Sequence, residues 1–374
     1  MQPSDGRPGE SCPALACVRA AVAQAGGWLP FDRFMALALY APQVGYYASG
    51  ARVFGQGPQD GSDFVTAAEL TPFFGATLAR QVAQALMATG TAAVWEFGAG
   101  NGTLAEQLLQ ALPQLGCGDV HYHIIEVSAA LRARQQQRLR PWGARVHWHE
   151  RWPERLDGVV LGNEVLDAMP VQLLHRRGGV WYERGVVWDE AAQALAWCDR
   201  PTALRPPCAI DGEHDYLTEI HPQAEAFVRT LAQRLRRGAV LWLDYGFPEH
   251  EYYHPQRAQG TLMCHRAHRA DDDPLREVGA KDITAHVNFT GIALAAQEAG
   301  LEVLGYTSQG RFLLNTGLLD VLQQAPLPQR AMALKLVHEH EMGELFKALM
   351  LAPPACATGW VPLGFAQGDR THTL

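Results

Sequence analysis

The stretch VWEFGAGNGTLAEQLLQAL, residues 94–112, limits what this chain can fold into more than any other segment. An apolar run ends at Glu96-Phe97, glycines alternate with single residues at positions 98, 100 and 102, and helix-favouring residues follow at once. A buried strand, a tight turn and a helix start in this order are typical of an open sheet of parallel strands. The free N–H groups of the helix start allow a ligand to approach the main chain there.

The same order of strand and helix repeats along the chain. Helices are predicted at 102–112, 128–140 and 222–237, and apolar runs predict strands at 92–97, 122–127, 144–149, 158–166 and 239–246. Because runs that end in an acid or a glycine suit strands buried on both faces, we expect an α/β fold with a mostly parallel, Rossmann-like sheet and helices on both faces. Ligand chemistry then belongs at the carboxyl ends of the strands.

Segments outside this rhythm predict additions to the sheet. Helical spacing over 14–40 is interrupted at 26–30, a further helix is predicted at 71–88, and the Gly-, Pro- and aromatic-rich segment 39–75 is expected to be irregular but ordered. Residues 171–221 break the α/β rhythm, and within them the stretch 171–190 alternates around an RRGG turn, which predicts an inserted β-hairpin. After an irregular region at 247–289, we expect a helix at 290–299, strands near 301–306 and 311–314, and a helical tail over 317–350.

These patterns divide the chain into six parts. They are a mobile tail (1–11), an N-terminal cap with a lid segment (12–88), the first part of the core (89–170), an inserted substrate-side region (171–221), the rest of the core with its irregular 247–289 region (222–316), and a C-terminal helical extension (317–374).

Composition excludes several classes of function. The 374 residues carry a net charge of −8 and no long basic run, so nucleic acid is not an expected partner. The seven cysteines form no CxxC pair, which argues against a disulfide framework or a zinc site and favours a reducing, cytoplasmic location. No apolar run reaches the roughly 18 residues of a membrane span. The pairs HYH (121–123) and HWH (147–149) could bind a metal, but no HExxH accompanies them and no metal is expected.

The glycine turn differs from a dinucleotide site because Thr103 stands where GxGxxG would need its third glycine. The order E-x-G-x-G-x-G instead resembles the turn of class I S-adenosylmethionine (SAM) methyltransferases. SAM is cationic, so the Glu96 carboxylate complements it and would repel a pyrophosphate. Glu126 closes the next strand, near the roughly 20-residue offset expected for an acid on ribose hydroxyls. A glycine turn without a ligand, a helix-capping Glu126 and a nicotinamide enzyme are the alternatives at this point.

Further blocks resemble the MidA-type methyltransferases, a family that includes the mitochondrial complex I assembly factor that methylates an arginine. The resemblance runs from about Phe34 to Lys347. Besides EFGAGNG, it rests on LYAPQVGYY (39–47), SDFVTAAELTPFFG (62–75), GNEVLDAMPV (162–171), GTLMCHRAH (260–268), DITAHVNF (282–289) and MGELFKAL (342–349). The chain departs from the family pattern at Ala68, His265 and Asn288, where Pro, Tyr and Asp are usual. The Asn288 departure could alter substrate contacts.

The resemblance implies SAM as cofactor and an arginine of a protein as methyl acceptor. The implied cofactor-binding residues are Glu96, Gly98, Ala99, Gly100, Gly102, Glu126, Val127 and Thr66. A guanidinium stays protonated, so its methylation needs carboxylates that grip it in a fork-like pair of bonds. The implied acceptor residues are Glu164, Asp167, Asn163, Glu69 and His286.

Plainer interpretations stand beside these roles. Asn163 could simply cap the start of a helix whose dipole Glu164 stabilises, whereas in the functional role Glu164 and Asp167, three residues apart, would share a face of one helical turn. His286 could be structural, Asp244 could only hold a loop, and the 39–75 segment could be a fixed cap and not a lid. A non-catalytic SAM-binding assembly factor, or an acceptor other than arginine, is also compatible with the sequence. A respiratory complex I subunit is the first candidate partner, and the oligomeric state, monomer or homodimer, is left open.

Overall fold

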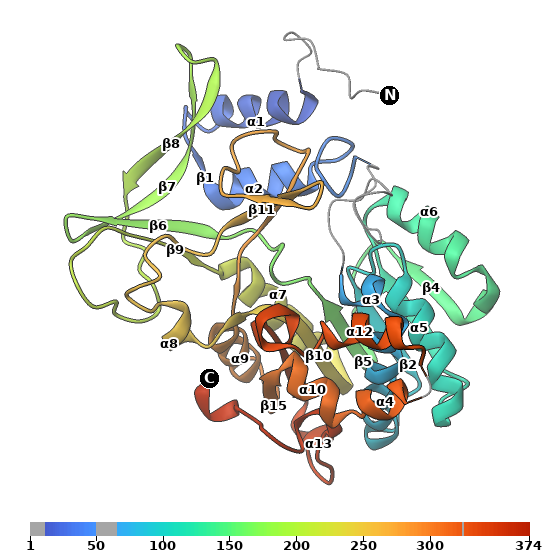
Figure 1. Cartoon of the computed structure of the whole chain (residues 1–374). Coiled ribbons are helices and arrows are strands. Elements are labelled where there is room, and N and C mark those ends of the chain that lie inside the picture. Colours follow the sequence, from blue (N-terminus) through green and yellow to red (C-terminus); the bar gives the residue numbers. More distant parts are fainter. Residues whose placement is uncertain (1–11, 50–65, 324) are drawn as a thin grey trace.

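The computed structural model describes residues 12–49, 66–323 and 325–374 (Figure 1). Its largest sheet has the strand order β15-β16-β10-β5-β2-β3-β4, with the short β14 beside β10. All neighbours from β10 to β4 pair in parallel, whereas β16 is antiparallel to both β10 and β15. The bounds are β2 Ala93–Phe97, β3 His121–Ile125, β4 Val146–His149, β5 Leu156–Asn163, β10 Leu235–Phe247, β14 Val287–Asn288, β15 Glu302–Ser308 and β16 Phe346–Ala352.

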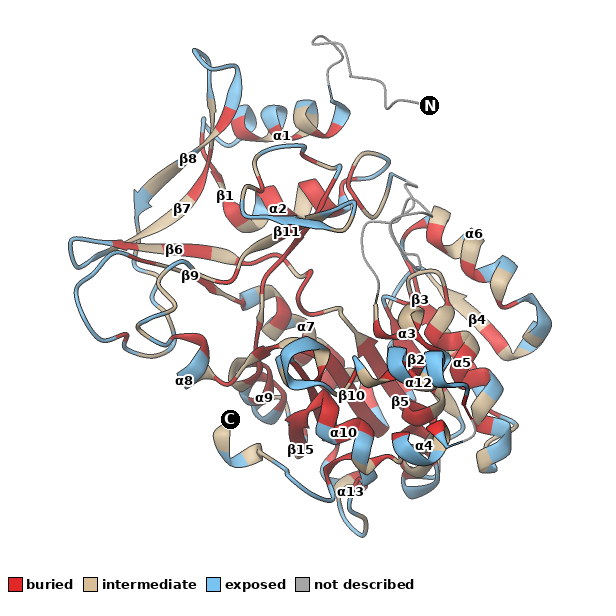
Figure 2. Cartoon of the chain, in the orientation of Figure 1, coloured by how far each residue is buried: buried red, intermediate tan, exposed pale blue. Residues whose placement is uncertain are grey.

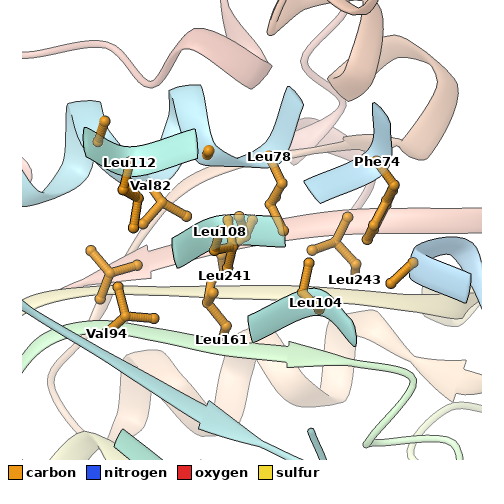
Figure 3. Packing of buried hydrophobic residues seen from close by; sticks show 14 of the residues in the cluster. Phe74, Leu78, Val82, Val94, Leu104, Leu108, Leu112, Leu161, Leu241 and Leu243 are labelled. Atoms are coloured by element: carbon orange, nitrogen blue, oxygen red, sulfur yellow. The ribbon is translucent and has the colours of Figure 1, made fainter. Parts of the chain in front are cut away.

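Helices cover both faces of this sheet, as the α/β rhythm predicts. On one face lie α4 (Pro72–Thr89), α5 (Thr103–Ala111), α10 (Gln309–Asn315), α11 (Leu318–Leu322) and α12 (Leu327–Leu334), and on the other α7 (Pro222–Arg234) and α9 (Phe289–Glu298). Strand β10 contributes to both layers. Its Leu241 and Leu243 pack with α4 and α5 (Figure 3), and Trp242 packs with α7 on the other face. Burial of a leucine of this kind contributes about 1.5–3 kcal/mol. Figure 2 shows the central strands of this sheet buried and the outer helix faces exposed.

A second group of elements forms a cap beside the sheet (Figure 1). A five-stranded sheet joins β1 (Leu29–Pro30), β7 (Val180–Asp189), β6 (Gln172–Arg177), β9 (Tyr216–Ile220) and β8 (Ala194–Pro201). It packs with α1 (Pro13–Gln24), α2 (Phe31–Tyr40) and the three-stranded sheet β12 (Arg269–Asp271), β11 (Met263–Arg266) and β13 (Asp282–Thr284) in one apolar cluster. The N-terminal segment and the insertion therefore share one core.

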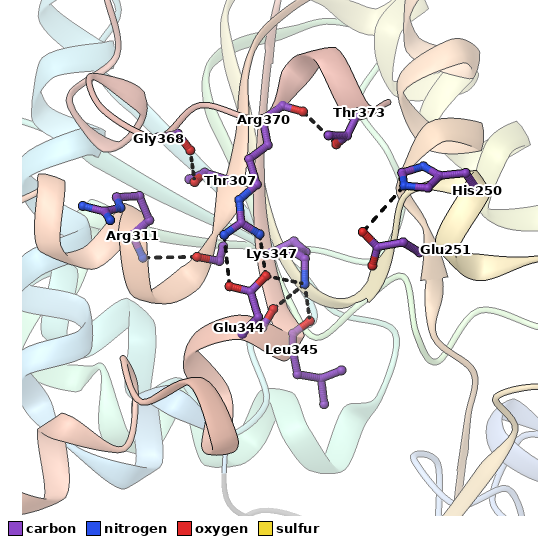
Figure 4. A network of polar contacts seen from close by, with 11 residues as sticks. His250, Glu251, Thr307, Arg311, Glu344, Leu345, Lys347, Gly368, Arg370 and Thr373 are labelled. Carbon is purple, nitrogen blue, oxygen red and sulfur yellow. Dashed lines mark hydrogen bonds and ion pairs between the residues drawn. The ribbon is translucent and has the colours of Figure 1, made fainter. Parts of the chain in front are cut away.

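Short elements complete the described chain. They are α3 (Ala67–Leu70), α6 (Ala129–Arg138), α8 (Glu249–Tyr252), α13 (Pro354–Ala357), the 3₁₀ turns η2 (Leu112–Leu115), η3 (Arg140–Arg145), η5 (Leu363–Phe365) and η6 (Thr371–Thr373), and the π turn η4 (Glu339–Gly343). The C-terminal segment is tied to the sheet through Arg370, which contacts both carboxylate oxygens of Glu344, while Lys347 caps the carbonyls of residues 344 and 345 (Figure 4).

Most predicted elements are confirmed. The five strands and three helices of the α/β rhythm appear within a few residues of their predicted ends, and the RRGG hairpin turns at Gly178-Gly179. The helix predicted at 71–88 is α4, which Thr71 caps by accepting a hydrogen bond from the Phe73 N–H at 3.4 Å. The predicted mobile tail and residues 50–65 of the lid segment lie outside the described residues.

Two predictions near the C-terminus are wrong. Residues 311–314, expected to be a strand, lie in α10, whose start is capped by Ser308. The predicted helical tail over 317–350 ends in β16, a strand buried along its whole length between β10 and β15. Pairing with two neighbours satisfies its backbone, and this tertiary context overrides the helix propensity of Ala, Leu, Met and Lys.

The part of the chain that the structure describes contains no helix that is both long and apolar enough to cross a membrane.

Candidate active site

A cavity of about 950 Å³ lies at the carboxyl ends of β2, β3 and β5, beneath the cap. Its position follows from the topology, because the chain leaves β2 for β3 on one side and the sheet continues with β5 on the other, and ligands bind at such a switch point. Twelve of the thirteen predicted site residues line it: Thr66, Glu69, Glu96, Gly98, Ala99, Gly100, Glu126, Val127, Asn163, Glu164, Asp167 and His286. The thirteenth, Gly102, does not line the cavity and begins α5.

The glycine turn has the backbone that its sequence predicts. Gly98, Gly100 and Gly102 have φ angles of 64°, 53° and 83°, a region that residues with a side chain rarely adopt. At Gly98 an added Cβ would also come within 2.9 Å of Val165 Cγ2. The turn therefore needs glycine both for its backbone and for its close approach to the loop after β5.

Glu96 lies buried beneath this turn. Its Oε2 accepts a hydrogen bond of 2.7 Å from the Tyr122 hydroxyl. Burial, with the nearby charge of Glu126, raises the pKa of Glu96 from its ordinary 4.5 to about 7, although the Tyr122 bond opposes this. A cationic ligand at the turn would favour the ionised carboxylate.

Glu126 follows β3 and is held at both carboxylate oxygens. The Ser128 N–H donates to Oε1 at 2.8 Å, and the Gln135 side-chain amide donates to Oε2 at 3.0 Å. Burial raises the pKa of Glu126, and these two hydrogen bonds oppose the shift. Its neighbour Val127 is 76% exposed at the cavity rim.

No helix begins at Asn163, so the helical interpretation of this block is wrong. Glu164 has a φ of 54°, and residues 164–170 form a turn that brings Glu164 and Asp167 into the cavity without a helical face. The Asn163 amide donates to Glu164 Oε1 at 3.0 Å. Burial and the charge of Asp167 raise the pKa of Glu164 to about 8. A non-glycine residue at positive φ is strained, and such strain clusters at functional sites.

Asp244 holds the turn after Asn163. Its Oδ2 accepts hydrogen bonds from the N–H groups of Val165, Leu166 and Asp167 at 3.0, 2.8 and 3.4 Å. Asp244 does not line the cavity, so its contacts match the loop-holding interpretation.

Asp167 is positioned by a tyrosine. The Tyr245 hydroxyl donates to Asp167 Oδ2 at 2.6 Å, whereas the buried Oδ1 has no partner. Burial raises the pKa of Asp167 to about 6, although the Tyr245 bond opposes it.

A sixth carboxyl group that the sequence did not single out also lines the cavity. Asp282 begins β13, and the Tyr47 hydroxyl lies 2.9 Å from both of its carboxylate oxygens, between which it shares its single proton. The ring of Tyr40 stacks on that of Tyr47, with 5.6 Å between the ring centroids. The Tyr40 hydroxyl donates to the Ala168 carbonyl at 2.8 Å. The only signal was the place of Asp282 at the head of the DITAHVNF block.

Glu69 accepts a hydrogen bond from the Thr103 hydroxyl.

His286 faces the cavity from a mainly aromatic surrounding. Its ring stacks on Phe247 at 5.3 Å and meets Tyr245 edge-on at 5.1 Å, and its buried Nδ1 has no partner. Burial and the positive charge of Arg257 lower its pKa to about 4, which leaves the imidazole neutral at pH 7. Asn288 lies outside the cavity lining and caps α9 by accepting a hydrogen bond from the Gly291 N–H, so any effect on substrate contacts would be indirect and stays a prediction.

The histidines of HYH and HWH pair with one another across β3 and β4. His121 Nδ1 lies 3.1 Å from His147 Nε2, and His123 Nδ1 lies 3.0 Å from His149 Nε2, both N–H···N hydrogen-bond distances. Burial lowers the pKa of His123 to about 4. Over residues 12–49, 66–323 and 325–374, no group of three or more potential ligands is arranged to hold a metal ion.

The cavity fits a cationic nucleoside such as SAM. Its described lining includes six carboxyl groups (Glu69, Glu96, Glu126, Glu164, Asp167 and Asp282) and neither lysine nor arginine. Four lining residues bury a polar atom that has no hydrogen-bond partner: Asn101, Asn163, Asp167 and His286. Since buried polar atoms are rarely left unpaired, a polar ligand is their natural partner.

Comparisons with known proteins agree with this geometry. Residues 77–307 match the family model described as "Putative S-adenosyl-L-methionine-dependent methyltransferase". A superfamily member from Burkholderia thailandensis, solved with bound S-adenosyl-homocysteine, is 50% identical with a TM-score of 0.93 and covers 99% of this chain and 100% of its own. The human protein arginine methyltransferase NDUFAF7, mitochondrial, is 28% identical over 371 residues, which cover 87% of this chain and 80% of the relative.

The Caenorhabditis elegans homolog of NDUFAF7 is similarly 27% identical over 367 residues, covering 87% of this chain and 83% of that relative. The family model spans more than half of the chain, and the match to the bacterial structure spans nearly all of it. The chain belongs to the MidA-type family of SAM-dependent methyltransferases, and SAM is its cofactor.

Proposed function

We propose that this methyltransferase transfers the methyl group of SAM to an arginine side chain of a protein partner. The observation that carries the proposal is the acidic lining of the cavity, in which six carboxyl groups surround a space with no lysine or arginine among the described lining residues. That field suits a permanently charged guanidinium. The relatives named protein arginine methyltransferases support the same acceptor.

The cofactor half of the cavity is formed by β2, β3 and the glycine turn. Bound SAM supplies a methyl group on a cationic sulfur. Glu96 and the turn from Gly98 hold the methionine part, and Glu126 accepts hydrogen bonds from the ribose hydroxyls. Thr66, Ala99 and Val127 contribute to the walls of this half.

The acceptor half is formed by the turn after β5 and by the cap. Glu164, with Asp167 or Glu69, accepts the forked N–H groups of the guanidinium and localises its charge away from the attacking nitrogen. Burial keeps Glu164 protonated at neutral pH until a cation enters, because its pKa is about 8. Asn163 orients Glu164, and the neutral imidazole of His286 is available to take the proton that the methylated nitrogen releases.

The partner is proposed to be a protein met in the cytoplasm, with a respiratory-chain subunit as the first acceptor to examine. The NDUFAF7 relatives are named as mitochondrial proteins, so the location of this chain is a separate question from its chemistry.

The first test replaces one carboxylate of the acceptor half. Glu164→Gln is nearly isosteric, and we expect it to lower methyl transfer about 100-fold or more, because it removes a charge aimed at the reacting group. Extract from cells that lack the chain is incubated with labelled SAM and either protein, and methylated arginines are identified by mass spectrometry. The affinity for S-adenosylhomocysteine should stay within a few-fold of wild type.

The matched control is Glu302→Gln, an exposed acid at the start of β15, which should leave transfer unchanged. If wild type binds the cofactor but labels no arginine in any extract, the arginine assignment is wrong. Labelled methyl groups on another type of residue or on a small molecule would show that the acceptor is not arginine.

A further inference from the structure

Gln135 connects the glycine turn, Glu126 and strand β4 from a position outside the cavity. It lies on α6, is fully buried and does not line the cavity. Its amide nitrogen donates to the Gly100 carbonyl at 2.8 Å and to Glu126 Oε2 at 3.0 Å, and its oxygen accepts from the Trp148 indole at 3.1 Å. Both amide hydrogens and the amide oxygen are therefore engaged.

The orientation of this amide is fixed by chemistry. The Trp148 indole N–H can only donate, and the Gly100 carbonyl can only accept. Reversing the amide would place an N–H against an N–H and an oxygen against both a carbonyl and a carboxylate. The Gln135 nitrogen must therefore face the glycine turn and Glu126.

These bonds determine which side of Glu126 is available to a ligand. One carboxylate oxygen is held by Ser128 at the start of α6 and the other by Gln135, one to two turns further along the same helix. A carboxylate has about four lone-pair sites, so the bonds from Ser128, Gln135 and the Val127 backbone do not use all of them. The same amide joins Glu126 to Gly100, so the acid and the turn cannot move independently.

We infer that Gln135 is a positioning residue for the cofactor, which holds Glu126 and the glycine turn in the arrangement that recognises the ribose hydroxyls. The inference rests on the proposed ribose role of Glu126. A hydrogen bond to a charged group buried in this way changes binding about 10-fold or more.

The test measures the binding of two probes, S-adenosylhomocysteine and its 2′-deoxyribose analogue, by calorimetry on the full chain. Wild type should prefer the ribose form. Gln135→Met, which keeps the volume but cannot donate, should bind S-adenosylhomocysteine about 10-fold more weakly and lose most of that preference. Gln135→Glu, which places a carboxylate against Glu126, should be weaker still. In steady-state assays the KM for SAM should rise with little change in kcat.

The next residue provides a matched control. Gln136 is exposed on the same helix, so Gln136→Met should bind both probes like wild type. Thermal unfolding monitors whether the variants fold. Trp148→Phe removes the indole N–H that fixes the Gln135 oxygen, and it should weaken the binding of S-adenosylhomocysteine less than Gln135→Met does.

A double-variant cycle distinguishes the positioning role of Gln135 from the proposed ribose contact of Glu126. Because Gln135 acts through Glu126, Glu126→Gln combined with Gln135→Met should be little worse than Glu126→Gln alone. Full additivity, or wild-type discrimination by Gln135→Met, would overturn the inference and leave the Glu126 assignment intact. If Glu126→Gln keeps the preference for ribose, the Glu126 assignment fails and the inference fails with it.

Discussion

The protonation of single carboxyl groups in the cavity depends on two opposing effects. Burial favours the neutral form, and the positive charge of a ligand favours the ionised form. Burial raises the pKa of Glu96 to about 7 and that of Glu164 to about 8, so near neutral pH Glu96 is about half protonated and Glu164 is mostly protonated in the free protein. A cation reverses that balance. The cavity is therefore less charged before binding than its composition suggests, which limits the repulsion among six neighbouring acids.

Glu96 gives the clearest pH dependence. Its native pKa lies above its ordinary value of 4.5, so its contribution to the stability of the free protein falls as pH rises from about 4.5 to 7. Binding of cationic SAM favours the ionised form and should therefore release protons at pH 6. Calorimetry in two buffers with different ionisation enthalpies measures this release.

Glu96→Gln should reduce that proton release, the remainder coming from Glu164, which is also protonated at pH 6 before a cation enters, whereas Glu302→Gln should keep the release in full. Wild type that binds SAM at pH 6 without releasing protons would show that Glu96 does not face the cationic part of the ligand.

At the scale of elements, the glycine turn packs closely against the loop after β5, where Gly98 lies beside Val165. Alanine at Gly98 would meet two penalties, a positive φ that costs about 1 kcal/mol and a Cβ 2.9 Å from Val165 that costs about 1–3 kcal/mol more. Gly90 has a similar φ of 59° but open space around it. We expect Gly98→Ala to lower the free energy of unfolding more than Gly90→Ala.

Gly98→Ala should also weaken the binding of S-adenosylhomocysteine about 10-fold, because the turn and the Val165 loop both line the cavity. Chemical unfolding and calorimetry on the two variants measure both effects. Equal losses of stability, with unchanged binding in both, would contradict the role of this contact.

The elements that could be predicted are those whose signal is local. Strand β2, its glycine turn and Glu126 follow from short segments in which apolar runs, acids and glycines lie together. The sequence QQQ at 135–137 says nothing of which glutamine is buried, because that depends on Trp148 and Gly100 meeting α6. Strand β16 was missed for a similar reason, since only its neighbours β10 and β15 make FKALMLA a strand.

At the scale of the molecule, the cap brings residues from distant parts of the chain to the acceptor half. Tyr47 and Asp282 meet there although 235 positions separate them, which no local pattern could predict. The cap depends on β1, whose Leu29 pairs with Val186 of the insertion. The N-terminal segment and the insertion should therefore lose stability together.

A substitution at Gly185 tests the pairing of β1 with β7. A Cβ at this position would lie 2.4 Å from the Leu29 carbonyl oxygen, so Gly185→Ala should lower the free energy of unfolding by about 1–3 kcal/mol. Gly118 is the matched control, because its nearest neighbour would be Pro113 at 3.8 Å, an ordinary contact. If thermal unfolding shows the two variants to be equally stable, β1 is not part of the cap sheet.

A crystal structure of this chain with S-adenosylhomocysteine is the most direct test of the cavity as a whole. We predict ribose hydroxyls within hydrogen-bond distance of Glu126, the amino group beside Glu96 and the glycine turn, and the sulfur facing Glu164 and Asp167. A nucleoside whose ribose lies away from Glu126, or whose sulfur points away from those two acids, would contradict the account.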